Sequence, residues 1–209
     1  MGLFAKTITA IALAGAASIA NANLLTNGDF ESNVGLSGHS WGVFSSIDGW
    51  TTLSGPGIEV QRNTVVNAES GNQYVELDSN SNSAMYQAIS GLSIGQTYSL
   101  DFWYHTRTNN GDNDNGINVY WGDTTPGNLQ LEISDLVSSQ TYSWIEYSTN
   151  LVATAETMYL TFSAEGLSNS LGGFIDNASL NSVPEPSNIA LLTIGLLGLI
   201  ISRRRANQA

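Results

Sequence analysis

Short runs of alternating apolar and polar residues recur along most of the chain, separated by Gly, Asn, Ser and Asp. The clearest is TYSLDFWYH, in which Leu100, Phe102 and Tyr104 would point to one side of a strand. No convincing helical period appears between residues 23 and 181. Similar runs are GIEVQ, QYVEL, AMYQAI, INVYW, LQLEI, WIEYST, MYLTFSA and GFIDNASL. This pattern predicts an all-β antiparallel sandwich or jelly roll.

The charge of the chain limits its partners. Of the 18 Asp and Glu residues, only Glu185 lies outside residues 23–182, and of the 6 Lys and Arg residues only Arg62 and Arg107 lie inside this segment. Because each phosphate contact needs a cation, so acidic a segment argues against nucleic acid and anionic lipid surfaces as partners. The chain has no cysteine, which excludes disulfides and thiolate metal sites. Divalent cations remain compatible partners.

The first 22 residues are typical of an export signal. The basic residue Lys6 precedes an apolar run, and the small residues Ala20 and Ala22 define a cleavage site. We therefore expect a signal helix in residues 1–22. Cleavage after Ala22 would make Asn23 the new N-terminus, and residues 23–182, which precede a second apolar segment, are enough for one domain with its own core.

A second apolar segment, residues 189–201, lies near the end of the chain. At ~1.5 Å per residue a helix of this length covers about 20 Å, short of the ~30 Å hydrocarbon core of a bilayer. Prolines and a charge precede it, and an arginine cluster follows it. These flanking residues are Pro184, Glu185, Pro186, Arg203, Arg204 and Arg205. The pattern favours a removable sorting tail in residues 183–209 over an ordinary single-span anchor.

This combination of Pro-Glu-Pro, a short apolar helix and terminal arginines resembles the PEP-CTERM sorting tails of Gram-negative bacteria. The resemblance implies recognition by an exosortase in the inner membrane, where the helix would reside transiently. It further implies a final place at the cell surface or in the extracellular matrix, and an association with exopolysaccharide and biofilm.

The two ends of the predicted domain carry a second resemblance. The stretches NLLTNGDFES (residues 23–32), DGWTT (residues 48–52) and GFIDNASL (residues 173–180) are similar to galactose-binding-like jelly rolls. Such jelly rolls occur among carbohydrate-binding modules and in exported proteins of the DUF642 kind. The resemblance implies that the first and last strands lie side by side and carry a structural calcium ion.

The resemblance also implies the calcium ligands. Glu31 and Asp176 match the carboxylate ligands of the family. Backbone carbonyls near Asp29 and Gln73, with an oxygen from residues 69–70 as a further candidate, would complete the six to eight oxygens that calcium takes. The alternative is that these carboxylates are solvated charges at strand edges.

A glycan-binding surface is predicted from aromatic and polar side chains that share a strand face, because sugars stack on rings and hydrogen-bond to amides and carboxylates. The candidate residues are Asp101, Trp103, His105, Arg107, Asn118 and Tyr120. If the strands on either side of residues 107–116 are neighbours, Trp103 and Tyr120 form one platform. Burial of both rings would instead favour a structural role.

The other tryptophans have different expected places. Trp50, Trp121 and Trp144 are expected in the core. Trp41 falls in SGHSWG, a predicted loop, where an exposed ring would indicate binding.

We find no catalytic pattern that fits a mechanism. Gly91–Gly95 matches G-x-S-x-G, but Ser93 lies between two strand patterns and not on a strand-to-helix turn. We therefore expect an exported glycan-binding protein and not an enzyme. The alternative is a matrix structural protein or adhesin that binds protein partners; a hydrolase would need a cleft with a carboxylate pair in unequal environments.

Overall fold

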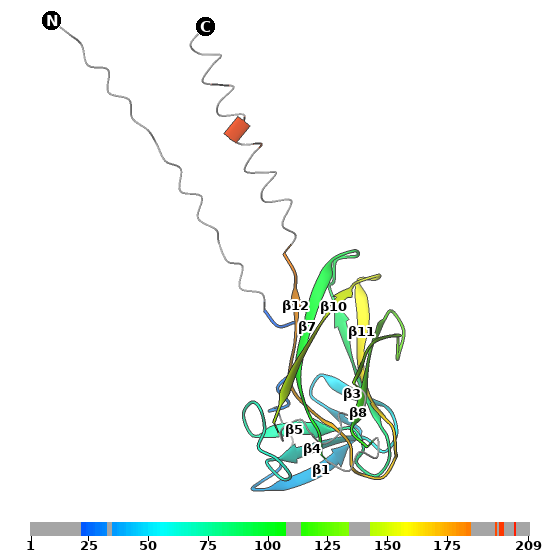
Figure 1. Cartoon of the computed structure of the whole chain (residues 1–209). Coiled ribbons are helices and arrows are strands. Elements are labelled where there is room, and N and C mark those ends of the chain that lie inside the picture. Colours follow the sequence, from blue (N-terminus) through cyan, green and yellow to red (C-terminus); the bar gives the residue numbers. More distant parts are fainter. Residues whose placement is uncertain are drawn as a thin grey trace, which may run out of the picture.

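The computed structural model describes residues 22–32, 35–107, 114–133 and 143–184, together with the helical positions Gly195, Leu197, Gly198 and Arg203 (Figure 1). Within these residues the chain forms strands in two antiparallel sheets. The strands are β1 (Ser40–Phe44), β2 (Ser46–Ile47), β3 (Trp50–Ser54), β4 (Ile58–Arg62), β5 (Gln73–Glu76), β6 (Ala84–Ser90), β7 (Thr97–His105), β8 (Gly116–Gly122), β9 (Asn128–Ile133), β10 (Ile145–Val152), β11 (Thr157–Glu165) and β12 (Phe174–Ser182).

The two sheets each contain six strands and face one another. Sheet A has the order β1-β4-β5-β12-β7-β10, and sheet B has the order β2-β3-β6-β11-β8-β9. Neighbouring strands are antiparallel throughout. The predicted all-β antiparallel sandwich is confirmed, and every alternating run identified in the sequence lies in a strand.

The core lies between the sheets and is built from the inward side chains of these alternating runs. Phe102 of β7 meets Phe162 of β11 edge to face, with ring centroids 5.1 Å apart. Trp50 packs on Phe162 from the other side, at 5.8 Å. Burying one such side chain contributes ~1.5–3 kcal/mol. Trp50 and Trp121 are both buried, as expected for core residues.

Strands β7 and β8 are not neighbours, so the condition for a platform of Trp103 and Tyr120 is not met. β7 lies between β12 and β10 in sheet A, whereas β8 lies between β11 and β9 in sheet B. The connection between them therefore crosses from one sheet to the other, and the hydroxyl of Tyr104 donates to the carbonyl of Asn115 (2.8 Å) where the chain enters β8. Alternation in sequence sets which face is buried, but it does not set which sheet a strand joins.

The start of the domain lies alongside its last strand, although it forms a turn and not the expected strand. Leu24 N–H donates to Leu180 O (2.9 Å), and Ala178 N–H donates to Gly28 O (2.8 Å). A side chain at Gly28 would place its Cβ 2.0 Å from Ala178 O, so only glycine fits there. Phe30 is buried with a positive φ of 54°.

The first and last described segments of the domain lie side by side, at the end of the sandwich nearest the grey traces in Figure 1. Val183 N–H still donates to Thr97 O (2.9 Å), so the chain is held to sheet A up to the predicted sorting tail. The signal helix, Glu185, Pro186, Arg204 and Arg205 lie outside the described residues. Among the residues described, no helix has the length and apolar character needed to cross a bilayer.

Candidate functional site

The outward face of sheet A carries polar and aromatic side chains in ordered rows. In one row Trp41 of β1 lies opposite Gln61 of β4, which lies opposite Tyr74 of β5. In the next row Glu59 of β4 lies opposite Glu76 of β5. These residues face outward because the residues between them, such as Val60 and Val75, point into the core.

A cavity of about 300 Å³ opens on this face. Its lining combines an exposed aromatic ring with hydrogen-bonding side chains and two charged side chains. Trp41 is 55% exposed although it lies in a strand. The lining residues are Trp41, Glu59, Gln61, Thr64, Val65, Ser79, Asn80, Arg107 and Ser170. We call this cavity the sheet A pocket.

Gln61 connects Glu59, which lines the sheet A pocket, to the neighbouring carboxyl group of Glu76. Its Nε2 donates to Glu59 Oε1 (2.9 Å) and also to Glu76 Oε2. Arg107 forms an ion pair with Glu76 through Nη1. The backbone N–H of Gly172 donates to Glu76 Oε1 (2.9 Å), so both oxygens of this buried carboxyl group have partners.

The electrostatics of this pair favour retention of a proton. Burial raises the pKa of Glu76 to about 8, although the hydrogen bond and charge of Arg107 act in the opposite direction. Burial also raises the pKa of Glu59, and the neighbouring Asp78 adds to this rise. Two carboxyl groups this close titrate as a pair, so near neutral pH they carry less than two negative charges.

Tyr74 holds the amide of Gln61 in place. Its hydroxyl donates to Gln61 Oε1 (2.8 Å) and accepts from the backbone N–H groups of Val65 (3.0 Å) and Val66 (3.1 Å). The loop that carries Thr64 and Val65 is thereby fixed over sheet A as one wall of the pocket. The Gln61 amide is therefore oriented before any ligand arrives.

The predicted glycan-binding residues in and just after β7 lie in different environments. Arg107 lines the sheet A pocket. His105 is buried under Trp144, with ring centroids 5.3 Å apart, and so cannot contact a ligand. Trp103 and Asp101 lie half-buried on the outward face of sheet A, where Asp101 accepts from Ser99 Oγ (3.1 Å).

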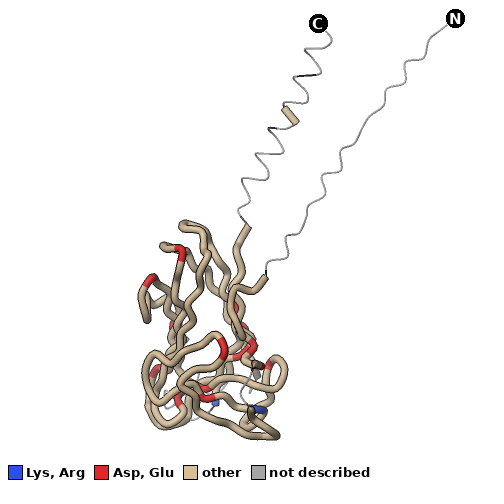
Figure 2. The backbone as a smooth tube through the Cα atoms, turned by 180° about the vertical axis from the view of Figure 1, so that it is seen from behind, with Lys and Arg blue, Asp and Glu red and all other residues tan. Residues whose placement is uncertain are grey.

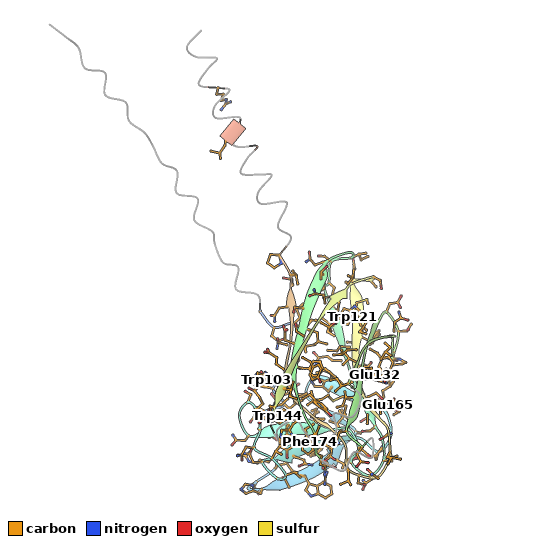
Figure 3. All side chains as sticks on the ribbon, viewed as in Figure 1. Trp103, Trp121, Glu132, Trp144, Glu165 and Phe174 are labelled. Atoms are coloured by element: carbon orange, nitrogen blue, oxygen red, sulfur yellow. The ribbon has the colours of Figure 1, made fainter. Side chains whose placement is uncertain are left out.

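Asn118 and Tyr120 lie on the other side of the molecule, on the outward face of sheet B. Asn118 Nδ2 donates to Glu165 Oε2 (3.0 Å) and contacts the Tyr120 hydroxyl (3.3 Å). Figure 3 shows Trp103 on one side of the sandwich and Glu165 on the other. The expected platform of Trp103 and Tyr120 is therefore wrong, because the two rings belong to different sheets.

Trp144 is half-buried on the outward face of sheet A, not in the core as predicted. Its ring packs against Tyr74, with centroids 5.8 Å apart, and its Nε1 donates to the carbonyl of Asn67 (2.9 Å). Figure 3 shows Trp144 near Phe174, which packs on Tyr74 at 4.8 Å. This aromatic cluster packs around Tyr74, whose hydroxyl holds the Gln61 amide of the pocket.

Sequence reasoning missed Glu59, Gln61 and Glu76 as site residues. Trp41, whose exposure was expected to indicate binding, is exposed but lies in β1 and not in a loop; the Gly- and Ser-rich segment before it hides the strand. The signal for the other three was present in GIEVQ and QYVEL, where polar residues alternate with apolar ones and so must share an outward face.

The predicted calcium ligands do come together, at the contact between the N-terminal turn and sheet A. Asp176 Oδ2 accepts the backbone N–H groups of Glu69 (2.8 Å) and Ser70 (2.9 Å). Glu31 Oε1 accepts the backbone N–H groups of residues 72 and 73 (2.6 Å each). We call this group the Asp176 cluster; it joins residues far apart in the sequence.

Two features of the Asp176 cluster suit a cation. The side chain of Gln73 donates through Nε2 to Glu31 O (3.1 Å), while its buried Oε1 has no partner among the described residues. Burial raises the pKa of the Asp176 carboxyl group to about 7, despite its backbone hydrogen bonds. A nearby cation would offset the free-energy cost of burying the ionised Asp176 carboxylate.

The remaining predicted ligand fits less closely. Asp29 is exposed and accepts only a long hydrogen bond from Glu31 N–H (3.5 Å). Within the described ranges, no three His, Asp or Glu side chains converge closely enough to hold a metal ion by themselves. An ion here would therefore depend on amide and backbone oxygens as well as on Glu31 and Asp176.

Comparison with known families identifies both parts of the chain. Residues 23–181 match the family described as Protein of unknown function (DUF642). The chain belongs to the DUF642 family. Residues 182–205 of this DUF642 protein match the PEP-CTERM protein-sorting motif, which marks proteins for export and surface association in Gram-negative bacteria. Both resemblances inferred from the sequence are confirmed.

A relative of this DUF642 protein occurs within a much longer chain. The Multifunctional-autoprocessing repeats-in-toxin of Vibrio cholerae serotype O1 is 27% identical over 165 residues, which cover 79% of this chain and 3% of the toxin. The toxin from Vibrio vulnificus is 27% identical over 162 residues, again 3% of its length. The DUF642 protein thus spans a small part of the curated relatives that it matches.

Similar solved structures share the sandwich fold. TmCBM61, solved in complex with beta-1,4-galactotriose, superposes with a TM-score of 0.51 at 20% identity, over 78% of this chain and 99% of that chain. The K1 cleaved adhesin domain of Lys-gingipain from Porphyromonas gingivalis W83 has a TM-score of 0.52 at 15% identity, over 71% of this chain and 100% of that chain. At these identities the likeness establishes the fold.

Proposed function

We propose that this protein is an exported, non-catalytic glycan-binding protein whose primary site is the sheet A pocket. The observation that carries the proposal is the exposed ring of Trp41 beside a fixed amide and a guanidinium group. Sugars are recognised by stacking of their C–H faces on aromatic rings and by hydrogen bonds from their hydroxyl groups to such polar side chains. The similar fold of TmCBM61, solved with a galactotriose, supports this class of ligand.

The predicted residues of β7 fit the proposal in part. Arg107 would bind sugar hydroxyls inside the pocket. Trp103 and Asp101 lie on the same outward face and would contact a longer glycan that continues across sheet A. Asn118 and Tyr120 lie on sheet B and have no part in this site.

We also propose that calcium binds at the Asp176 cluster. Glu31, Asp176 and Gln73 would supply side-chain oxygens, and the backbone carbonyl near Asp29 is a further candidate. The ion would supply positive charge to buried carboxylates and would tie the N-terminal turn to β12. Its proposed role is structural.

The sorting motif extends the proposal to location and partners. An exosortase would process the tail, and the released domain would act at the cell surface or in a polysaccharide matrix. Figure 2 shows acidic residues distributed over the domain and few basic ones, which suits a soluble matrix component and opposes binding to anionic polymers.

The test is a binding screen of the purified full-length chain against bacterial and plant polysaccharides, with the Trp41→Ala and Tyr120→Ala variants beside it. We expect at least one neutral or cationic glycan to bind, about tenfold more weakly to Trp41→Ala and equally well to Tyr120→Ala, because stacking contributes ~1 kcal/mol or more. Absence of binding to every glycan would contradict the proposal and favour a matrix protein or adhesin that binds other proteins.

A further inference from the structure

The sheet A pocket has an unbalanced charge. Glu59 lines it, Glu76 is joined to Glu59 through the Gln61 amide, and Asp78 is close enough to raise the pKa of Glu59. Arg107 is the basic side chain that lines the pocket, and it is paired with Glu76. Among the described residues, Glu59 has no ion-pair partner.

Buried polar atoms around this charge also lack partners. Ser79 lines the pocket, is buried, and its Oγ has no hydrogen bond within the described part of the chain. Asp78 uses one carboxyl oxygen for the backbone N–H groups of Asn169 (2.9 Å) and Ser170 (3.1 Å), and its other oxygen is unpartnered. A ligand that donates hydrogen bonds would satisfy the Ser79 hydroxyl.

We propose that the sheet A pocket selects a glycan with free amino groups, that is, a 2-amino-2-deoxy sugar whose ammonium group pairs with Glu59. This inference rests on the proposed function and names the sugar class for the same site. A protonated amine offers three donors and a full positive charge, which match one carboxylate without a cation and a nearby unpartnered hydroxyl. The rest of the sugar stacks on Trp41.

Other sugar classes fit this charge less well. A neutral sugar brings no positive charge to the Glu59–Glu76 pair, which then has only the single charge of Arg107 beside it. A uronic acid would bring a further carboxylate toward Glu59, Glu76 and Asp78, against the single charge of Arg107. The selectivity for an amine therefore follows from the ion pair between Arg107 and Glu76, which leaves Glu59 available.

Binding of the ammonium group has a defined proton balance. Near neutral pH the Glu59–Glu76 pair retains a proton, because burial raises the pKa of both carboxyl groups. When the ammonium group arrives, the pair becomes more fully ionised and its proton passes to the buffer. The amine keeps its own proton, so binding of one amino group releases up to one proton.

The experiment compares glucosamine hexamer with N-acetylglucosamine hexamer by isothermal titration of the full-length chain at pH 6, where the amine is protonated. We expect the amino form to bind at least about tenfold more tightly, and Glu59→Gln to remove this preference. Glu132→Gln, which removes an exposed charge from sheet B on the far side of the sandwich in Figure 3, is the matched control and should preserve the preference.

A second measurement on the unmodified protein does not depend on the folding of a variant. Titrations in two buffers of different ionisation enthalpy should show proton release with the amino hexamer and none with the acetylated one. Equal affinities, no proton release, or binding only of a neutral glycan would overturn the inference and leave the proposed function standing. If no glycan in the wider screen binds, the proposed function itself fails.

Discussion

Two groups of carboxylates lie at sheet A, and they differ in the groups that donate hydrogen bonds to them. In the Asp176 cluster, the oxygens of Asp176 and Glu31 accept backbone N–H groups from residues 69, 70, 72, 73 and 177. In the sheet A pocket, Glu59 and Glu76 are held mainly by the side chains of Gln61 and Arg107. Both groups carry carboxyl groups whose pKa is raised by burial.

The difference indicates different roles. A carboxylate that accepts backbone N–H groups fixes the path of the chain, because moving it leaves several buried donors unpaired. Gly71 illustrates how tight this cluster is, since a Cβ there would lie 2.4 Å from Glu31 Cδ. A carboxylate held by side chains in an open pocket can exchange partners at lower cost. We therefore assign stability to the first group and binding to the second.

The largest expected effect is on stability at the Asp176 cluster. Asp176→Ala removes the acceptor for the N–H groups of Glu69 and Ser70 and should lower the free energy of unfolding by about 3 kcal/mol. Urea unfolding followed by tryptophan fluorescence measures it. The control is Asp101→Ala on the same sheet, which should lower the free energy of unfolding by less than about 1 kcal/mol. Equal losses in both variants would argue against a special stabilising role for the Asp176 cluster.

Calcium should act on the same cluster with a somewhat smaller effect. Millimolar calcium is expected to raise the Tm of the chain relative to EDTA, corresponding to about 2 kcal/mol if the ion is present at many times its Kd. Gln73→Ala, which removes the unpartnered Oε1, should abolish most of this shift. Thermal melts measure the change in Tm, and an unchanged calcium-induced shift in Gln73→Ala would argue against the Asp176 cluster as the calcium site.

The sheet A pocket should affect stability through pH. Because the folded-state pKa of Glu76 is raised from 4.5 to about 8, its contribution to stability is present at acid pH and is lost as pH rises between these values. We expect the free energy of unfolding to fall by on the order of 1 kcal/mol from pH 5 to pH 8 in calcium-free buffer. Glu76→Gln should flatten this slope, and a variant that keeps the full slope would assign it to other groups.

The smallest expected effect concerns the face of sheet B. Tyr120→Phe removes a hydroxyl that contacts Asn118 at 3.3 Å on a half-exposed side chain. We expect a change in stability below about 0.5 kcal/mol and unchanged glycan affinity. A loss of glycan binding, measured in the same screen, would move the site to sheet B.

Local patterns in the sequence predicted the strands well. TYSLDFWYH corresponds to β7 over its whole length, because inward and outward residues alternate without interruption. β1 was missed because its short run follows a Gly- and Ser-rich segment and is half-exposed. The first strand implied by the family resemblance is a turn in this chain, where Phe30 has a positive φ that its short sequence does not reveal.

Local patterns could not predict which sheet a strand joins or which distant side chains meet. Nothing in the segment between Arg107 and Gly116 tells whether the chain turns back in one sheet or crosses to the other. For the same reason the pairing of Arg107 with Glu76, which lies 31 residues away in the chain, could not be predicted. The Asp176 cluster was found only through resemblance to a family, since its partners are separated by over 100 residues.

The most direct test of glycan binding at the sheet A pocket is a crystal structure of the full-length chain with the tightest-binding oligosaccharide from the screen. We expect a sugar ring stacked on Trp41, with its polar groups at Gln61, Glu59 and Arg107. Electron density for the sugar on the outward face of sheet B beside Tyr120, with an empty sheet A pocket, would contradict it.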